Sequence, residues 1–187
     1  WRMAMQIRKA MSQSDQRELL TGIVEMDECY VGGKPRKDVK HDDDDMPKRG
    51  RGTKKAPVIG AVSRGGKVAA KAVKKDELKG KILRAFVKEC VDPTNSRLMT
   101  DEYKGYVGMS KLLCHDVIKS KVWYVNGEIH TNTTEGFWAL LKRGMFGQFY
   151  SVSRKHLQRY VDEFCFRYNN RANDNDFDLT VSRALGV

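Results

Sequence analysis

The sequence predicts an α/β protein built on a mixed β-sheet. Three strand-like segments follow one another in the first half of the chain, and strands and helices alternate after them. That order is typical of a sheet with helices packed against it. The chain has 187 residues, of which 40% are hydrophobic, so it is long enough for one domain with a proper core. No run of about 18 apolar residues is present, which excludes a transmembrane helix.

The first 20 residues predict a helix or a linker, because Met3, Ile7 and Met11 recur in helical phase. The chain opens without an initiator Met, and charged residues interrupt its first apolar ones. We therefore expect neither a complete N-terminus nor a signal peptide. Residues 22–33 predict the first strand, since they are rich in apolar and β-branched side chains and close on a glycine pair.

Residues 35–56 predict a mobile loop. They contain two Pro, two Gly, a run of four Asp and almost no apolar side chains, so they cannot build a core. The run Asp42–Asp45 has the composition of a metal site. However, adjacent carboxylates on a flexible segment repel one another and are not preorganised, so we expect no metal there.

The next two segments are a hairpin and a helix. Residues 56–75 predict a β-hairpin, because an Arg-Gly-Gly turn joins two apolar runs. Residues 76–91 predict an amphipathic helix with Asp76 as its N-cap. Its apolar stripe has a spacing of four and consists of Leu78, Ile82, Phe86 and Cys90.

The second half of the chain alternates between strands and helices. A turn, a short strand, a short helix and another strand are expected over residues 93–95, 97–103, 104–113 and 115–125. Two longer helices follow over residues 131–146 and 153–171, and the second carries a clear apolar stripe.

The chain is strongly basic, with a net charge of +11 and an isoelectric point near 9.5. This balance indicates a polyanionic partner, either a nucleic acid or an anionic membrane surface. Residues 34–75 hold 14 Lys and Arg against 5 Asp, so +9 of the charge lies there. A set of solvated surface charges is the alternative interpretation of this segment.

The four cysteines are far apart in the sequence and form no CxxC pair. This spacing argues against a structural zinc site and against a disulfide framework. Buried free thiols in a reducing cytosol are the expected state.

Three acidic residues stand where the predicted elements give them a chemical role. Asp27 is in the middle of the first strand, Asp101 lies toward the C-terminal end of the strand over 97–103, and Glu135 lies near the start of the helix over 131–146. The ends of strands are where α/β proteins gather functional groups. Hard divalent cations prefer carboxylate oxygens, and two of them about 3.5–4 Å apart promote phosphoryl transfer. The acids therefore predict a Mg²⁺ or Mn²⁺ site with two ions.

Each acid also has a plain structural interpretation. Asp27 fits an exposed position on an edge strand, and Asp101 fits the N-cap of the following short helix. Asn132 and Glu135 fit a capping box, as N-cap and N3 residue. Lys142 lies two turns after Glu135, about 10 Å further at ~1.5 Å per residue. The two form a polar edge beside the apolar stripe of this helix.

Three blocks of the sequence resemble one family. MDECYVGGK surrounds Asp27, LMTDEYKGY surrounds Asp101, and HTNTTEGFWALLKRGMFGQFYSVSRKHLQRYVDEFCFRYNNR surrounds Glu135. These blocks are similar to DDE-type transposases of bacterial insertion sequences related to Merlin elements. The separation of Asp101 and Glu135, 135 − 101 = 34 positions, is similar to that in DDE recombinases. The resemblance extends from about Thr21 to Arg171.

The resemblance implies an RNase H-like mixed sheet flanked by helices, with a catalytic domain over residues 21–171 and a C-terminal tail over 172–187. It implies that Asp27, Asp101 and Glu135 form the metal-binding catalytic triad. It also implies that Lys142, with Arg143 beside it, contacts DNA near the cleavage site. Family members carry a zinc-ribbon DNA-binding region upstream, whose cysteine pairs we do not find here.

Further residues are candidate DNA contacts. His130 and Asn132 flank the predicted helix start and could orient a phosphate, although capping and a polar surface explain them equally well. Trp123, Tyr124 and Trp138 could stack on an unpaired base, but core packing is the stronger interpretation of Trp138. Basic side chains of the loop are expected to contact DNA without sequence preference: Lys48, Arg49, Arg51, Lys54 and Lys55.

The sequence thus predicts a transposase domain that cleaves and joins DNA strands at element ends with Mg²⁺ or Mn²⁺. Its expected partners are transposon-end and target DNA, with a homodimer or higher oligomer on DNA and no membrane. Its expected location is the bacterial cytoplasm, associated with the nucleoid. Two alternatives stay open: an RNase H-like nuclease that does not join strands, and an inactive remnant that only binds DNA.

Overall fold

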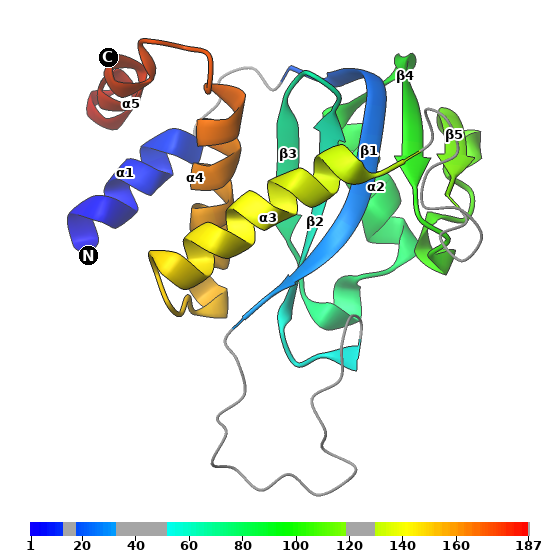
Figure 1. Ribbon diagram of the computed structural model, residues 1–187, viewed down its shortest axis with the longest axis horizontal. Coiled ribbons are helices and arrows are strands. Elements are labelled where there is room, and N and C mark those ends of the chain that lie inside the picture. Colours follow the sequence, from blue (N-terminus) through cyan, green and yellow to red (C-terminus); the bar gives the residue numbers. More distant parts are fainter. Residues whose placement is uncertain (13–17, 33–51, 119–129, 187) are drawn as a thin grey trace, which may run out of the picture.

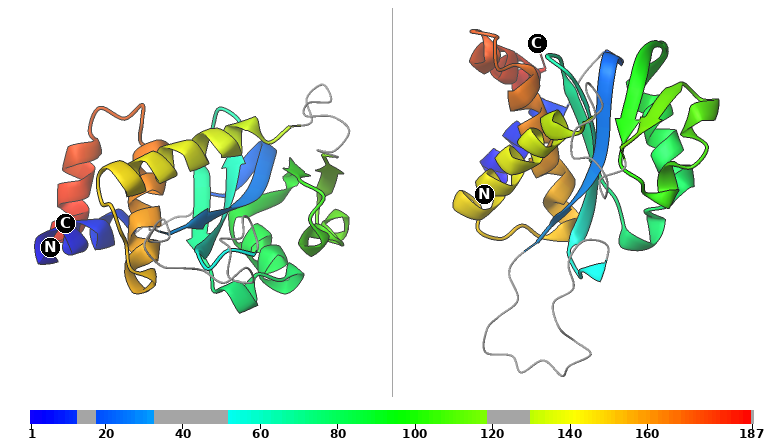
Figure 2. Two further views of the ribbon diagram at one scale, coloured as in Figure 1. Left: turned by 60° about the horizontal axis from the view of Figure 1, so that its bottom comes forward. Right: turned by 45° about the vertical axis from the view of Figure 1, so that its right-hand side comes forward.

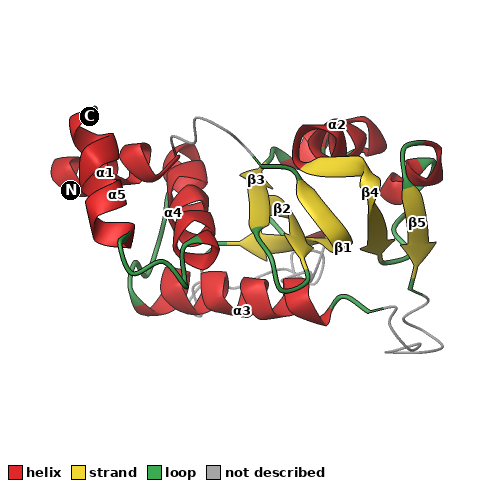
Figure 3. Cartoon of the chain, turned by 90° about the horizontal axis from the view of Figure 1, so that it is seen from above, coloured by secondary structure: helices red, strands yellow, loops and turns green. Residues whose placement is uncertain are grey.

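A single five-stranded sheet separates two groups of helices. The computed structural model describes residues 1–12, 18–32, 52–118 and 130–186. Figure 1 shows α3 crossing one face of the sheet, and Figure 3 shows α2 on the opposite face. Helix α4 lies on the same side as α3 and packs against β3. The α/β class expected from the sequence is confirmed.

The strands are β1 (Leu20–Val31), β2 (Ala56–Ser63), β3 (Val68–Ala72), β4 (Val91–Thr100) and β5 (Cys114–Val117), in the spatial order β3-β2-β1-β4-β5. Strand β2 is antiparallel to both of its neighbours, whereas β4 is parallel to β1 and to β5. The sheet is therefore mixed, as predicted, and its topology is that of the RNase H-like architecture. Because β1 is bonded on both sides, the interpretation of Asp27 as an edge-strand residue is wrong.

Successive side chains of β1 point to opposite faces of the sheet. Val24 and Met26 are fully buried in the core beneath α2 (Gly80–Cys90). Cys29 packs into a second core beneath α3 (Asn132–Gly147) and α4 (Leu157–Asn169). A central strand with both faces covered has little room for charge, so each polar side chain on β1 requires a partner.

Several predicted boundaries differ from the structure. Helix α2 begins after Lys79 without a side-chain cap, and Asp76 lies in a separate 3-10 turn, η3 (Lys75–Glu77), so Asp76 is not its N-cap. The expected turn at 93–95 lies inside β4, where Asp92 accepts hydrogen bonds from the amides of Thr94 and Asn95. The expected short helix over 104–113 is a pair of 3-10 turns, η4 (Lys104–Tyr106) and η5 (Met109–Lys111).

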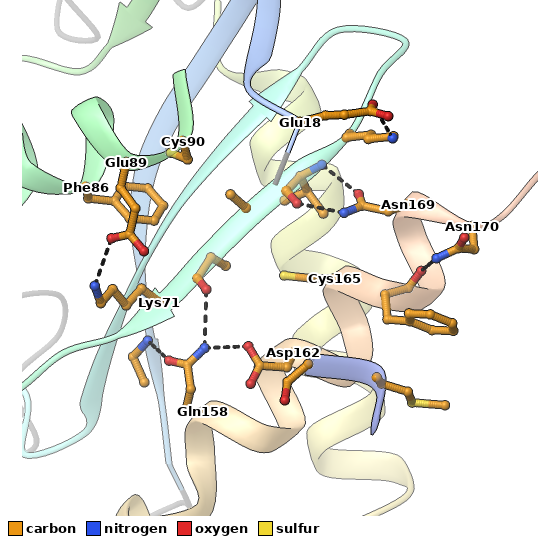
Figure 4. A pocket seen from close by; sticks show the side chains of 18 of the residues that line it. Glu18, Lys71, Phe86, Glu89, Cys90, Gln158, Asp162, Cys165, Asn169 and Asn170 are labelled. Atoms are coloured by element: carbon orange, nitrogen blue, oxygen red, sulfur yellow. Dashed lines mark hydrogen bonds and ion pairs between the residues drawn. The ribbon is translucent and has the colours of Figure 1, made fainter. Parts of the chain in front are cut away.

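The outer edge of β3 is closed by side chains of α4 (Figure 4). Gln158 accepts a hydrogen bond from the Ala72 amide at 2.7 Å, and Asn169 accepts one from the Val68 amide at 2.7 Å. Asn169 also donates to the Val68 carbonyl. These side chains border a pocket of about 710 Å³ between β3, α2 and α4. An edge strand whose backbone groups are already paired is protected from pairing with another chain.

Two further helices lie beyond α4, at the side of the sheet where both termini are found (Figure 2). They are α1 (Arg2–Ser12) and α5 (Asp176–Leu185), which pack against each other. The helix expected over residues 1–20 is therefore shorter, since Leu20 already belongs to β1. Arg8 of α1 donates to Glu163 of α4 at 2.7 Å, and both side chains are largely buried. A short 3-10 turn, η6 (Arg154–His156), precedes α4.

Within the described ranges, none of the four cysteines forms a disulfide; Cys29 and Cys90 are buried, Cys165 is half-buried and Cys114 is exposed. The expectation of buried thiols is thus wrong for Cys114. None of the described helices is both long enough and apolar enough to cross a membrane.

Candidate functional site

Asp27 lies on the face of β1 that α3 covers. The indole nitrogen of Trp138 on α3 donates to its Oδ2 atom at 3.2 Å. Directly opposite Asp27 on β2 is Gly60, and a Cβ there would lie 2.5 Å from Cη2 of Trp138. The glycine therefore leaves the space in which the indole ring lies over β2 and reaches Asp27. Trp138 is 4% exposed, so it packs in the core and also binds the candidate catalytic carboxylate.

Asp101 follows the last residue of β4, next to β1 in the sheet. The parallel register pairs Glu25 with Met99, and the same offset brings Asp101 level with Asp27. The Asp101 Oδ1 atom accepts a hydrogen bond from the Tyr103 amide at 3.0 Å. The following 3-10 turn has Tyr103 as its N-cap residue, so Asp101 holds a local turn and is not a helix cap.

Burial and neighbouring charge act together on Asp27. Burial, together with the charges of Glu28 and Asp101, raises the pKa of its carboxyl from 3.8 to about 7, while hydrogen bonds from the Glu28 amide and Trp138 oppose this rise. A nearby cation would favour the ionised form of this carboxyl and lower its pKa again. The pair formed by Asp27 and Asp101 therefore fits a divalent cation.

The raised pKa of Asp27 predicts a pH-dependent effect of Asp27→Asn on the metal-free protein. Between pH 4 and 7 the folded parent holds a proton that the unfolded chain has lost, because the pKa rises from 3.8 to about 7 on folding. The free energy of unfolding of the parent therefore falls as pH rises through this window. The Asn variant escapes this loss and should be more stable at pH 8 by about 2–4 kcal/mol.

Urea denaturation in the presence of EDTA at pH 4, 6 and 8 measures this difference. The gain should vanish near pH 4 and reach its full size above pH 7. Glu102→Gln removes an exposed carboxylate next to Asp101 and serves as the control without a pH-dependent gain. A gain for Asp27→Asn that is equal at all three pH values would contradict the prediction.

A further acidic residue and a tyrosine lie on the other face of β1. The hydroxyl of Tyr106 donates to Glu28 Oε2 at 2.9 Å, and Tyr106 is 2% exposed. Burial raises the pKa of Tyr106 well above its usual value, and the charges of Glu28, Asp27 and Asp101 add to this rise. Three acidic side chains thus gather at this end of the sheet.

Helix α3 runs alongside β1 and presents its polar edge there. Trp138 contacts Asp27. The pKa of the Cys29 thiol is raised to about 12, chiefly by burial, and the charge of Lys142 opposes this rise. Glu135 precedes Trp138 by three positions and Lys142 follows it by four, so all three lie on one side of the helix. Glu135 and Lys142 are exposed, whereas Phe137, Leu141 and Met145 are buried, as predicted.

The start of α3 differs from the predicted capping box. The N-cap residue is Thr131, not Asn132, and it makes no side-chain cap bond. The amides of Thr133 and Thr134 instead donate to Oε2 of Glu25, at 2.7 and 3.0 Å. Sequence reasoning missed Glu25, although its position two residues before Asp27 on a covered strand was an available signal.

The structure brings Asp27 and Asp101 together and places Glu135 on the helix that covers Asp27. In the described ranges, no three or more His, Cys, Asp or Glu side chains are grouped closely enough to hold a metal ion. Convergence of all three acids on a metal stays a prediction.

The other predicted contacts are dispersed. His130 is half-buried beside Glu25, Asn132 and Arg143 are exposed on α3, and Lys54 and Lys55 lie just before β2. Arg154 donates to the Lys54 carbonyl. Outside the described residues lie Lys48, Arg49, Arg51, Trp123, Tyr124 and Asp42–Asp45.

The fold and the acidic pair define an α/β domain with a candidate active site between β1, β4 and α3. The chain belongs to the ISXO2-like transposases, since residues 19–169 match the ISXO2-like transposase domain. No curated protein matches the chain.

Three solved structures of Mos1 are similar to this chain at low identity. They are the Mos1 strand transfer complex (TM-score 0.43, 11% identity, covering 99% of this chain and 61% of that one), the Mos1 transposase paired-end complex with left transposon end (0.40, 14%, 97% and 62%) and a pre-cleavage Mos1 transpososome (0.43, 12%, 98% and 63%). The chain spans about three fifths of the length of the Mos1 chains.

Proposed function

We propose that this domain cleaves DNA strands at transposon ends and transfers them to target DNA. The observation that supports this most is the pairing of Asp27 with Asp101 in a family of transposases. Burial keeps the Asp27 carboxyl from ionising readily, so the site favours a cation beside it. Membership of the family alone is also compatible with a nuclease that does not join strands and with an inactive DNA-binding remnant.

The proposed cofactor is Mg²⁺ or Mn²⁺, as two ions. Asp27, Asp101 and Glu135 would hold them, because carboxylate oxygens suit these hard cations and leave room for water and phosphate. When bound, the ions activate the attacking hydroxyl and stabilise the leaving oxygen of an in-line displacement.

The residues of the chain contribute position and charge. The Trp138 N–H donates to Oδ2 of Asp27, and the Tyr103 N–H donates to Oδ1 of Asp101, so these hydrogen bonds help to orient both carboxylates. The orientation of these groups does not depend on the DNA, which reduces the reorganisation needed for reaction.

Positively charged and polar side chains around the site are proposed to hold the DNA. Lys142 and Arg143 project from α3 near the acids, with His130 and Asn132 at the start of the same helix. Lys54 and Lys55, with Lys48, Arg49 and Arg51 earlier in the segment, would contact phosphates without sequence preference. We further propose that the domain works as a homodimer or higher oligomer on nucleoid DNA.

Lys142→Gln should weaken engagement of DNA at the active site with little effect on folding. Lys142 is exposed, so its loss opens no cavity and should leave the melting temperature nearly unchanged. A lost charged hydrogen bond to phosphate costs about 1–2 kcal/mol, which corresponds to about 5–30-fold in binding. Lys142→Arg keeps the charge and should retain much of the activity. Competition binding with pre-nicked end DNA measures the change in affinity. A Gln variant with the parental affinity and cleavage rate would show that Lys142 is an ordinary charged surface residue.

One assay separates the three candidate functions. The protein is incubated with labelled element-end DNA and a target plasmid, with Mg²⁺, with Mn²⁺ or with EDTA. Metal-dependent cleavage together with joined products supports the proposed transposase. Cleavage without joining supports the nuclease, and binding without cleavage supports the inactive remnant.

A further inference from the structure

Glu25 is a fully buried carboxylate with five partners. Its side chain on β1 is 0% exposed. Besides the amides of Thr133 and Thr134, it accepts a hydrogen bond from the Thr133 hydroxyl at 2.9 Å and one from Arg64 Nε at 2.6 Å. His130 Nδ1 lies 3.2 Å from Oε1. A buried charge is tolerated only with such complete pairing.

The partners of Glu25 make it the cap of α3 from a distant strand. The first amides of a helix have no partner within the helix, and here Glu25 accepts those at the second and third helical positions. A negative charge at this end of a helix is also favoured by the helix dipole. Thr131, the N-cap residue, supplies no side-chain bond, so Glu25 takes over that function.

This contact joins two parts of the proposed active site. Glu25 precedes Asp27 by two positions on the same face of β1, about 6.6 Å away along the strand. Glu135 directly follows Thr134, whose amide Glu25 holds, and the Thr134 hydroxyl donates to the Glu25 carbonyl at 3.1 Å. The backbone around Glu135 is therefore fastened to the strand that carries Asp27.

Arg64 fixes this arrangement from a third side. Its Nη2 atom donates to the His130 carbonyl at 3.1 Å while its Nε atom donates to Glu25. Arg64 begins the turn between β2 and β3, and its amide donates to the Ile23 carbonyl of β1. One guanidinium thus ties the segment leading into α3 to the central strand.

We propose that Glu25 is a positioning residue of the active site. It holds the first turn of α3, and with it Glu135, at a set distance from Asp27 and Asp101, so that the three acids share the metal ions. The proposal rests on the proposed metal-dependent function. Glu25 itself touches neither the metal nor the DNA, because its oxygens are occupied by the partners named above.

The chain offers a matched control for a purely structural ion pair. Glu163 on α4 is also buried, with 8% exposure, and accepts a hydrogen bond from Arg8 at 2.7 Å. It also forms an ion pair with Arg167 on the same helix, and both of these arginines lie outside β1 and α3. Both Glu25→Gln and Glu163→Gln remove the charge of a buried pair and should lower the melting temperature.

The test is a Mn²⁺ titration without DNA, read as the rise in melting temperature of the parent, Glu25→Gln and Glu163→Gln proteins. Loss of a residue that orients metal ligands typically weakens metal affinity about 10–100-fold. We expect Glu25→Gln to raise the half-saturating Mn²⁺ concentration at least about tenfold and Glu163→Gln to leave it at the parental value. Hydrogen exchange at the Thr133 and Thr134 amides should also accelerate in the Glu25 variant alone.

Thr133→Val provides a milder variant in case Glu25→Gln does not fold. It removes only the hydroxyl bond to Glu25 and should shift the Mn²⁺ requirement in the same direction by a smaller factor. Equal Mn²⁺ requirements for the parent, Glu25→Gln and Thr133→Val would overturn the positioning role while leaving the proposed function intact. A parent protein that Mn²⁺ does not stabilise would overturn the proposed function itself.

Discussion

Asp27→Asn and Asp101→Asn are each expected to reduce metal-dependent DNA cleavage by about a thousandfold or more. Stabilisation of transition-state charge by metal ions is worth several kcal/mol, and each ~1.4 kcal/mol changes a rate tenfold. An amide occupies the same volume as a carboxylate and still accepts the bonds from Trp138 and Tyr103. The fold should therefore persist in both variants. Cleavage rates with Mg²⁺ and circular dichroism spectra together measure this combination.

Two results would contradict the assignment of these acids. Cleavage at the parental rate by both variants would exclude them as ligands. Loss of the native spectrum in both variants would mean that unfolding explains their reduced cleavage. Glu102→Gln is the control, since Glu102 is exposed directly after Asp101. It should keep the parental rate of cleavage, which would show that loss of a negative charge at this end of β4 is not by itself enough to reduce cleavage.

The sequence was sufficient to predict the parts of this site that depend on local periodicity. Asp27 interrupts an apolar strand and Asp101 follows one, so their residue types and positions already indicate a role at a sheet. The two strands are neighbours in parallel orientation, which brings both acids to one level. The polar edge formed by Glu135 and Lys142 was also predictable, because helical phase alone separates it from the buried stripe.

Features that depend on distant partners were not predictable from the same patterns. Asn132 and Glu135 have the spacing of a capping box, yet Glu25, more than 100 positions earlier, takes the helix amides. A local pattern cannot show that a buried carboxylate from another strand will compete for those donors. Asp76 failed as a helix cap for a related reason, since its own segment forms a separate 3-10 turn.

Residues near the chain ends also depend on distant partners that local sequence patterns do not reveal. The helix expected to reach residue 20 ends at Ser12, because Leu20 is recruited into β1 and paired with β4. Part of the expected C-terminal tail forms α5, which is stabilised by packing against α1. Short helices depend more on tertiary packing than on propensity. Their existence therefore follows from contacts that neither segment shows by itself.

Glu135→Gln is expected to abolish cleavage and strand transfer nearly as completely as the Asp variants, while leaving the DNA affinity of the domain almost unchanged. The side chain is exposed on the first turn of α3, so its replacement disturbs no core packing. A carboxylate in the first helical turn contributes only about 0.3–1 kcal/mol through the helix dipole. A large loss of activity would therefore have to arise from impaired metal binding. Rates of cleavage and joining with Mg²⁺ and Mn²⁺ measure it, together with thermal unfolding.

Asp178→Asn provides the matched control for Glu135→Gln. Asp178 is also an exposed acid in the first turn of a helix, but it lies on α5, outside the matched transposase domain. Its replacement should cost a similar small amount of stability and leave both reaction steps intact. Parental cleavage by the Glu135 variant would reject Glu135 as the third acid and leave a site built on Asp27 and Asp101. A variant that still cleaves but no longer joins strands would instead assign Glu135 to the strand-transfer step of the proposed reaction.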